Sequence, residues 1–365
     1  MNLSIFSLAM LLGLSVLSLI DSLGEVCRWI SIRYKSRTAT RVPESPFPAR
    51  AHQGSVPVIG VLSSGSADNS AQLVNAFHRG LAENGYVEGQ NLTVEYRWAE
   101  GIYDRLPAMA VELARMPLTL LVSLGGEPTA MVAKAATSTI PIVADVGVDP
   151  VASGLVASRS RPGRNITGIS CRTEALEPER LGLLQELIPR GGLLQELMPR
   201  GPTVGVLLNS NKLTPASQTR ELWEVARAID MQLHILRAST DDDIDAAFDS
   251  IRQNRIPVLA VASDAFFNTR RDKLVALAAD SAVPAMYSSR EYAEIGGLMS
   301  YGMNPSDVCH KVGIHAGGIL NGAKPYDLPV MQPTKFELVI NLQTARALKL
   351  EIPATLLARA DELIE

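Results

Sequence analysis

An alternation of short apolar runs with amphipathic stretches begins near Val56 and constrains the fold more than any other feature of this sequence. The run "VPVIGVLSS" at 56–64 has the Val, Ile and Leu content of a buried strand. The next stretch, "SAQLVNAFHRGLAENGY" at 70–86, places apolar side chains at helical spacing. Strands that are apolar throughout and separated by helices predict a parallel sheet with helices on both faces.

The alternation divides into two series along the chain. The first series continues with predicted strands at 91–98, 118–124, 140–146 and 165–170 and predicted helices at 103–116, 127–137 and 150–157. The second series has predicted helices at 177–187, 215–229, 241–253 and 267–280 and predicted strands at 203–210, 231–239, 257–264 and 284–289. A chain of 365 residues is also long for one core. We therefore predict an α/β fold of two Rossmann-like lobes with parallel sheets.

The C-terminal segments are too few for a third core. They are the predicted elements at 296–302, 305–321 and 335–341, and a last helix ending in "LLARADELIE". We expect them to return to both lobes, so that several chain crossings join the lobes as a hinge.

Charge and cysteine usage exclude several function classes. The formal net charge of −4 gives no electrostatic reason to expect nucleic acid as a partner. Cys27, Cys171 and Cys309 are widely separated and form no CxxC, so we expect no metal. A disulfide between Cys171 and Cys309 stays open at this point, beside the alternative that both are small buried side chains.

No nucleotide or catalytic motif occurs in the sequence. It contains no GxxxxGK[ST], no GxGxxG placed after a strand, and no GxSxG nucleophile elbow. We therefore expect no cofactor and no enzyme activity.

Ligands of open parallel sheets bind beyond the carboxyl ends of the strands, where helix N-termini present unpaired N–H groups. The loops after the predicted strands supply the candidate ligand-binding residues Ser63, Ser64, Gly65, Gly125, Gly126, Glu127, Thr129, Asp149, Ser210, Asn211, Asp264 and Tyr301. Asp149 and Asp264 could equally be helix caps. We expect a ligand carboxylate on N–H groups near Glu127 or Ser66, and a ligand ammonium at Asp264.

The N-terminus carries an uncharged apolar run of about 20 residues, long enough for the core of a signal peptide or for a membrane span. No Lys or Arg precedes this run and five occur after it by residue 41, a bias that disfavours export of the rest of the chain. Ala49-Arg50-Ala51 is a small-x-small triplet of the kind that signal peptidases cut. We expect residues 1–53 to be an atypical leader or membrane segment with a linker.

The stretch 182–201, "GLLQELIPRGGLLQELMPRG", contains nearly the same ten residues twice. Pro189 and Gly191-Gly192 break a helix between the copies. We interpret the second copy as a tandem duplication in a surface loop away from the ligand, since added loop costs little entropy.

Several longer segments, in order over about residues 55–365, resemble one known family. They are "PVIGVLSSGS", "GYVEGQNLTVEYRWAEGIYDRLPAMAVEL", "VAKAATSTIPIVADVGVDPVASGLVAS", "RPGRNITGIS", "GGLMSYG" and "LPVMQPTKFELVINLQTARALKL". The sequence is similar to the ABC-transporter substrate-binding protein family that includes tryptophan- and phenylalanine-binding members.

The resemblance implies a periplasmic binding protein of type I, with two lobes joined by a three-segment hinge. It implies lobe 1 over 54–168 plus 299–334, and lobe 2 over 169–298 plus 335–365. It further implies a monomer in the periplasm, or attached to the outer face of the inner membrane, that delivers a small organic ligand to an ABC permease with its ATPase. An amino acid, and an aromatic one in particular, is the ligand that this resemblance favours.

Two other classes remain as alternatives. A ligand-sensing domain of a regulatory system shares the architecture, but no DNA-binding domain is evident before Val56. An α/β enzyme would need a nucleophile or cofactor motif, and turnover of a bound ligand would reveal it.

Overall fold

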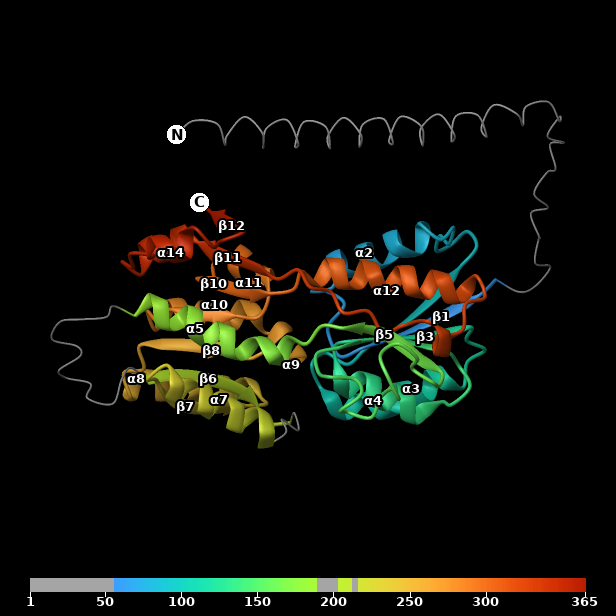
Figure 1. Cartoon of the computed structure of the whole chain (residues 1–365), viewed down its shortest axis with the longest axis horizontal. Helices are drawn as coiled ribbons and strands as arrows, with labels where there is room; N and C mark the ends of the chain where they lie inside the picture. Colours follow the sequence, from blue (N-terminus) through green and yellow to red (C-terminus); the bar gives the residue numbers. More distant parts are fainter. Residues whose placement is uncertain (1–55, 189–202, 212–215) are drawn as a thin grey trace, which may run out of the picture. The chain divides into compact units, whose positions relative to one another are not determined.

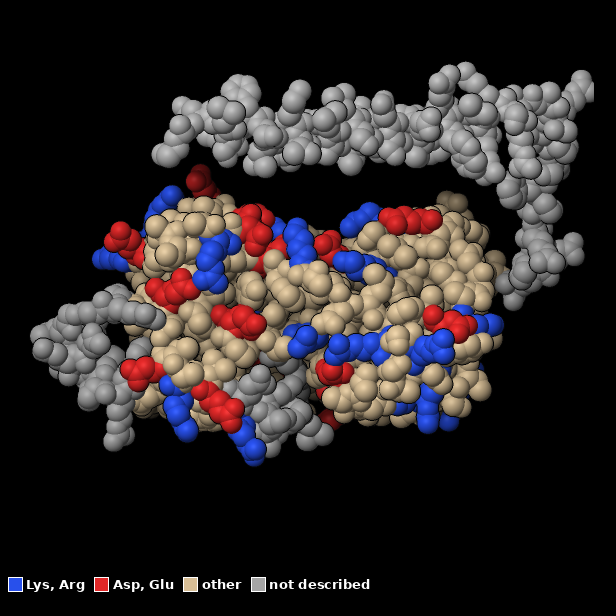
Figure 2. Space-filling model, viewed as in Figure 1, with Lys and Arg blue, Asp and Glu red and all other residues tan. Residues whose placement is uncertain are grey.

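The computed structural model describes residues 56–188, 203–211 and 216–365 (Figure 1). The apolar N-terminal run and the second copy of the repeated ten residues lie outside these ranges, so the interpretations given for them stay predictions. None of the helices in the described ranges has the length and apolar character needed to cross a membrane. Lys and Arg side chains are interspersed with Asp and Glu on the face shown in Figure 2.

The first sheet has five parallel strands in the order β2-β1-β3-β4-β5. These strands are β1 Val58–Ser63, β2 Thr93–Trp98, β3 Leu120–Leu124, β4 Ile142–Val146 and β5 Ile166–Ser170.

Helices cover both faces of this sheet. In Figure 1, α2 (Ala71–Ala82) and α12 (Pro305–Leu320) lie on one side of it, and α3 (Leu106–Ala114) and α4 (Glu127–Ala136) lie on the other. The core divides accordingly: Ile59 packs with the first pair of helices and Leu62 with the second. The short η1 (Tyr103–Arg105) precedes α3.

The second sheet has seven strands in the order β12-β11-β10-β9-β8-β6-β7, parallel except between β10 and β11. Its strands are β6 Thr203–Asn209, β7 Gln232–Ala238, β8 Val258–Val261, β9 Ala285–Tyr287, β10 Met299–Gly302, β11 Glu337–Asn341 and β12 Glu362–Ile364.

Two further core clusters lie on the faces of the second sheet. One cluster involves α5 Glu177–Leu187, α7 Ala216–Ala228, α13 Leu342–Ala347 and α14 Ala354–Leu357. The other involves α8 Asp241–Gln253, α9 Ala265–Asn268, α10 Arg271–Asp280 and α11 Arg290–Glu294. The predicted fold of two α/β lobes is confirmed.

The chain crosses between the lobes three times within the described residues. The first crossing leaves β5 and enters α5 through η2 (Thr173–Leu176), and the second joins β10 to α12. The third comes after η3 (Pro325–Asp327) and leads to β11.

Some predicted elements differ from the structure. β10 was expected with lobe 1, but Met299 and Ser300 pair with β9 in the second sheet, so the crossing comes after Gly302. The other predicted lobe boundaries stay predictions. Residues 150–154 form turns instead of a helix, and the φ of +72° at Gly154 prevents a helix from continuing through this residue. The last residues form β12, since they pair with β11.

The helices α2 and α12 approach each other through two glycines. A Cβ on Gly80 would lie 2.1 Å from the carbonyl oxygen of His310, and one on Gly313 would lie 2.2 Å from that of Phe77. Only glycine permits this backbone contact, which fixes α12 on the first lobe.

A buried arginine connects two of the crossings. Arg180 is 0% exposed and donates to the carbonyl oxygens of Thr173, on the first crossing, and Tyr301, before the second. Its guanidinium also pairs with Glu177 at 2.7 Å. One side chain therefore holds the two crossings at a fixed distance.

Candidate functional site

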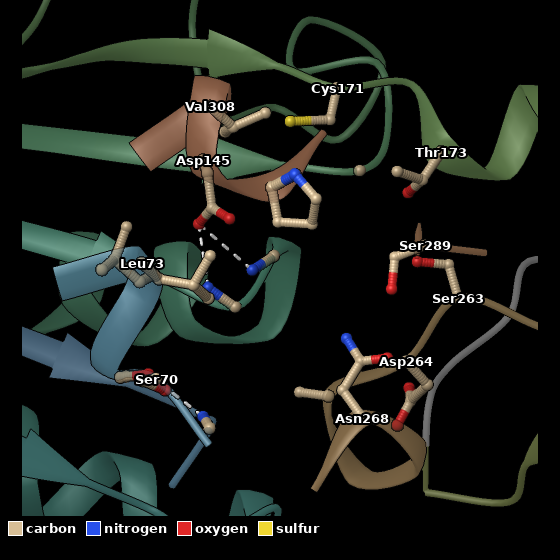
Figure 3. A pocket seen from close by; sticks show the side chains of 18 of the residues that line it. Ser70, Leu73, Asp145, Cys171, Thr173, Ser263, Asp264, Asn268, Ser289 and Val308 are labelled. Carbon is tan, nitrogen blue, oxygen red and sulfur yellow. Dashed lines mark hydrogen bonds between the residues drawn. The ribbon is translucent and has the colours of Figure 1, made fainter. Parts of the chain in front are cut away.

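A cavity of about 220 Å³ lies between the carboxyl ends of the two sets of strands (Figure 3). A cavity of this volume suits a small molecule. Figure 3 shows side chains reaching into it from both lobes, with Leu73, Asp145 and Val308 on one side and Asn268 and Ser289 on the other.

The first lobe supplies most of the apolar wall. Leu73 and Val74 come from α2 and Val308 from α12, while Trp98 ends β2. The Trp98 ring stacks on Tyr96, with ring centroids 5.6 Å apart and planes 3° from parallel. A rigid aromatic surface therefore borders the cavity.

Asp145 is a carboxylate that the first lobe presents to the cavity, and the sequence prediction did not include it. It lies in β4, and its Oδ1 accepts hydrogen bonds from the N–H groups of Gly125 at 2.9 Å and Gly126 at 3.4 Å. Burial raises its pKa to about 6, although these two hydrogen bonds act to lower it. A single polar residue inside the apolar run "IPIVADV" was the available signal.

Asp264 has its polar partners within the protein. Its Oδ1 accepts from the N–H of Phe266 as a helix cap and from Asn209 Nδ2, at 2.9 and 2.8 Å. Its Oδ2 accepts from the hydroxyl of Tyr103 in the other lobe at 2.9 Å. The helix-cap interpretation thus describes Asp264, although the residue also borders the cavity.

Arg271 and Glu291 are charged residues of the second lobe that line the cavity, and the sequence prediction did not include Arg271. Arg271 Nη2 donates to Asn69 Oδ1 at 3.3 Å, across the lobes. Within the described residues, its Nε and the Oε2 of Glu291 are buried and have no hydrogen-bond partner. Both residues lie in the first turn of a helix, where charged side chains are also common at solvated ends.

The cavity lining includes about half of the predicted site residues. Those that line it are Ser63, Gly65, Gly125, Gly126, Glu127 and Asp264. The others, Ser64, Thr129, Asp149, Ser210, Asn211 and Tyr301, do not belong to the lining.

Each of the others has a different structural role or position. Ser64 Oγ donates to the carbonyl oxygen of Gly125 and supports a turn in which Gly125 has a φ of +102°, a conformation that favours glycine. Thr129 is fully buried in α4. Asp149 pairs with Arg159 and accepts from the N–H of Val151 in the turn that follows it, where no helix forms for it to cap.

Ser210 and Asn211 come directly after β6 and are exposed. The N–H of Asn211 donates to Asn209 Oδ1 at 2.9 Å. The Tyr301 ring lies against Phe336, with centroids 6.1 Å apart, so it packs beside the hinge and away from the cavity.

Cys171 and Cys309 also line the cavity, and both are free thiols. Burial raises the pKa of each thiol, and Asp145 adds to the shift. The alternative of two small buried side chains therefore describes them better than the disulfide. In the described part of the chain, no group of His, Cys, Asp and Glu side chains has the arrangement of a metal site.

The cavity between the two lobes has an apolar wall and a few charged groups. The sequence of both lobes matches one family. The family model described as ABC transporter substrate binding protein matches residues 56–364. The chain belongs to this family. Proteins of this family bind small-molecule substrates and work with an ABC permease and its ATPase, and the predicted family is confirmed. Members of this class bind their substrate and are not enzymes.

Two solved structures and one characterised protein are similar to this substrate-binding protein. A conserved domain protein from Vibrio cholerae has a TM-score of 0.73 at 25% identity, over 84% of this chain and 99% of that one. The ABC domain from Streptococcus pneumonia in complex with L-Trp has a TM-score of 0.70 at 25% identity, over 85% and 100% of the two chains. The tyrosine-binding protein of Clostridioides difficile strain R20291 is 25% identical over 276 residues, which are 75% of this chain and 76% of that protein.

Proposed function

We propose that this substrate-binding protein captures an amino acid with an apolar or aromatic side chain and delivers it to an ABC importer on the outer side of the membrane. One observation carries the proposal. The cavity combines a carboxylate of the first lobe, Asp145, with a guanidinium of the second lobe, Arg271, and neither forms an ion pair among the described residues. An amino acid brings the two opposite charges that this pair requires.

The ligand ammonium is assigned to Asp145. Its two hydrogen bonds come from backbone N–H groups, so the carboxylate keeps acceptor capacity for the ligand. This assignment replaces Asp264, whose oxygens already accept three hydrogen bonds from Phe266, Asn209 and Tyr103.

The ligand carboxylate is assigned to Arg271, whose buried Nε has no acceptor in the described structure. The N–H groups at the start of α4, expected from the sequence, are less favourable, because Gly125 and Gly126 already donate to Asp145. Arg271 is a fork-shaped donor, which matches a carboxylate well.

The ligand side chain is assigned to the wall formed by Leu73, Val74, Trp98 and Val308. Apolar and aromatic surface favours an apolar side chain, because its burial removes that surface from water. The tryptophan and tyrosine bound by the Streptococcus and Clostridioides relatives have side chains of this kind.

Isothermal titration calorimetry with the 20 common L-amino acids tests the proposal. We expect an aromatic or large aliphatic amino acid to bind most tightly, and Asp145→Asn to lower its affinity by about 100-fold, because the ammonium loses a buried charged partner. Asp249→Asn, on the exposed face of α8, is the matched control and should leave affinity unchanged. Absence of heat for every amino acid, or unchanged affinity in Asp145→Asn, would contradict the proposal.

A further inference from the structure

Asp145, Glu291 and Arg271 are charged side chains of the cavity that form no ion pair among the described residues, and two of the three are acidic. Asp145 stands on the first lobe, while Glu291 and Arg271 stand on the second. The neutral donors on Asp264 add no positive charge. The cavity therefore holds more negative than positive charge.

The carboxylates of Asp145 and Glu291 both influence one residue of the cavity wall, Cys309. Burial of Cys309 raises its pKa, and the charges of Asp145 and Glu291 raise it further. Cys309 lies on α12, beside the second crossing, so the charges of carboxylates from both lobes act on its thiol. Enclosing two like charges away from water is unfavourable unless a cation accompanies them.

Arg271 does not supply that cation to either carboxylate. No ion pair joins it to Asp145 or Glu291 among the described residues, and its guanidinium donates instead to the amide oxygen of Asn69. The Oε2 of Glu291 remains a buried acceptor without a donor in the described chain. A buried carboxylate oxygen in this state is unfavourable without a donor, and a ligand in the cavity can supply one.

We propose that the amine is the group of the ligand that this cavity requires, and that its ammonium lies between Asp145 of the first lobe and Glu291 of the second. The contact between the ligand carboxylate and Arg271 then contributes less to affinity than the contacts of the ammonium. The amine offsets the repulsion that closure creates, so primary amines without a carboxylate bind, whereas carboxylic acids without an amine do not. This inference rests on the proposed function, because it assigns selectivity to the same cavity.

Six probes in two matched series test the inference by calorimetry. They are L-tryptophan, tryptamine and indole-3-propionate, and L-tyrosine, tyramine and 3-(4-hydroxyphenyl)propionate. We expect each amine to bind within about tenfold of its amino acid, the loss being one charge-assisted hydrogen-bonded contact. Each acid should lose about 100-fold or more, because both carboxylates stay unpaired.

Two variants of α11 locate the effect. Glu291→Gln keeps the shape of the side chain and removes its charge. It should lower the affinity for tryptamine and tyramine by about tenfold, and so reduce the ratio of amine affinity to acid affinity. Glu294→Gln, on the same helix and paired with Arg290, is the control and should leave the six affinities unchanged. If Glu291→Gln fails to fold by circular dichroism, the probe series on the wild-type protein decides.

The outcomes separate the two proposals. Amines that bind no better than the acids, or an amine-to-acid ratio unchanged in folded Glu291→Gln, overturn the amine requirement and leave amino-acid binding intact. Binding of the amines without either amino acid supports the amine requirement and overturns the proposal of an aromatic amino acid. Absence of binding by all six probes overturns both.

Discussion

The hydroxyl of Tyr103 in the first lobe donates a 2.9 Å hydrogen bond to Oδ2 of Asp264 in the second. The same carboxylate caps α9 through the N–H of Phe266. Asp264 therefore acts in two ways, as a local cap and as the acceptor of a contact that exists only when the lobes are together.

Tyr103→Phe removes this contact without removing the ring. We expect ligand affinity to fall about tenfold, or about 1.4 kcal/mol, because the closed state loses one hydrogen bond to a carboxylate. Calorimetry measures the change. Tyr96→Phe, which removes a hydroxyl bonded to His78 within one lobe, is the control and should keep affinity. Equal effects of the two variants would show that closure does not depend on Tyr103.

The pKa of Asp145 predicts a pH dependence of binding. An ammonium binds the ionised carboxylate, so affinity should fall as the pH drops below about 6, by up to tenfold per pH unit. Titrations between pH 5 and pH 8 test this slope, which Asp145→Asn should abolish. A flat profile in the wild-type protein would contradict the assignment.

The Asp145 carboxyl also makes the stability of the ligand-free protein depend on pH, and this dependence has the opposite sign to that of binding. Its pKa is about 6 in the folded state against an ordinary value of 3.8, so between these values the folded chain holds more protons than the unfolded one. The free energy of unfolding that Asp145 contributes therefore decreases as the pH rises through this window. Urea titrations of the wild-type protein and Asp145→Asn, compared at pH 4.5 and pH 7, measure the difference.

The glycine contact between α2 and α12 predicts that the same substitution, glycine to alanine, changes stability very differently at two positions of α12. Gly313→Ala places a Cβ 2.2 Å from the carbonyl oxygen of Phe77 and should destabilise the protein by about 3 kcal/mol. Gly318→Ala on the same helix meets no atom within 4 Å and should be neutral or stabilising by about 0.5–1 kcal/mol. Urea denaturation distinguishes the two, and similar values would contradict the packing argument.

Arg180 predicts a stability loss of a different origin. Arg180→Met leaves Glu177 buried without its cation and should cost about 3–5 kcal/mol. Adding Glu177→Gln should recover part of this loss, because the uncompensated charge is gone. The exposed pair of Arg359 and Glu186 is the control, and Arg359→Met should cost at most about 1 kcal/mol.

The two-lobed fold could be predicted because buried parallel strands require apolar side chains on both faces, as in "PVIGVL" and "TVGVLL". The strand β12 could not, since "ELI" is too short to show a period and depends on pairing with β11. Of the residues predicted from the loops after strands, Ser63 and Gly125 line the cavity.

The charged residues of the cavity were harder to find from sequence. Asp145 is one polar residue in an apolar strand, and its burial depends on the turn after a neighbouring strand. Arg271 and Glu291 occupy first turns of helices, where sequence alone does not distinguish a solvated charge from one that faces a cavity. Their roles depend on how the lobes meet, which is tertiary information.

The late return of the chain to both lobes governs when each core can form during synthesis. The first lobe lacks the Val308 and Val312 of α12, and the second lacks the Leu338 and Ile340 of β11, until nearly the whole chain has left the ribosome. On one face of each sheet the core can therefore be completed only after these late segments are available, whereas the second lobe's other core cluster ends at Tyr292.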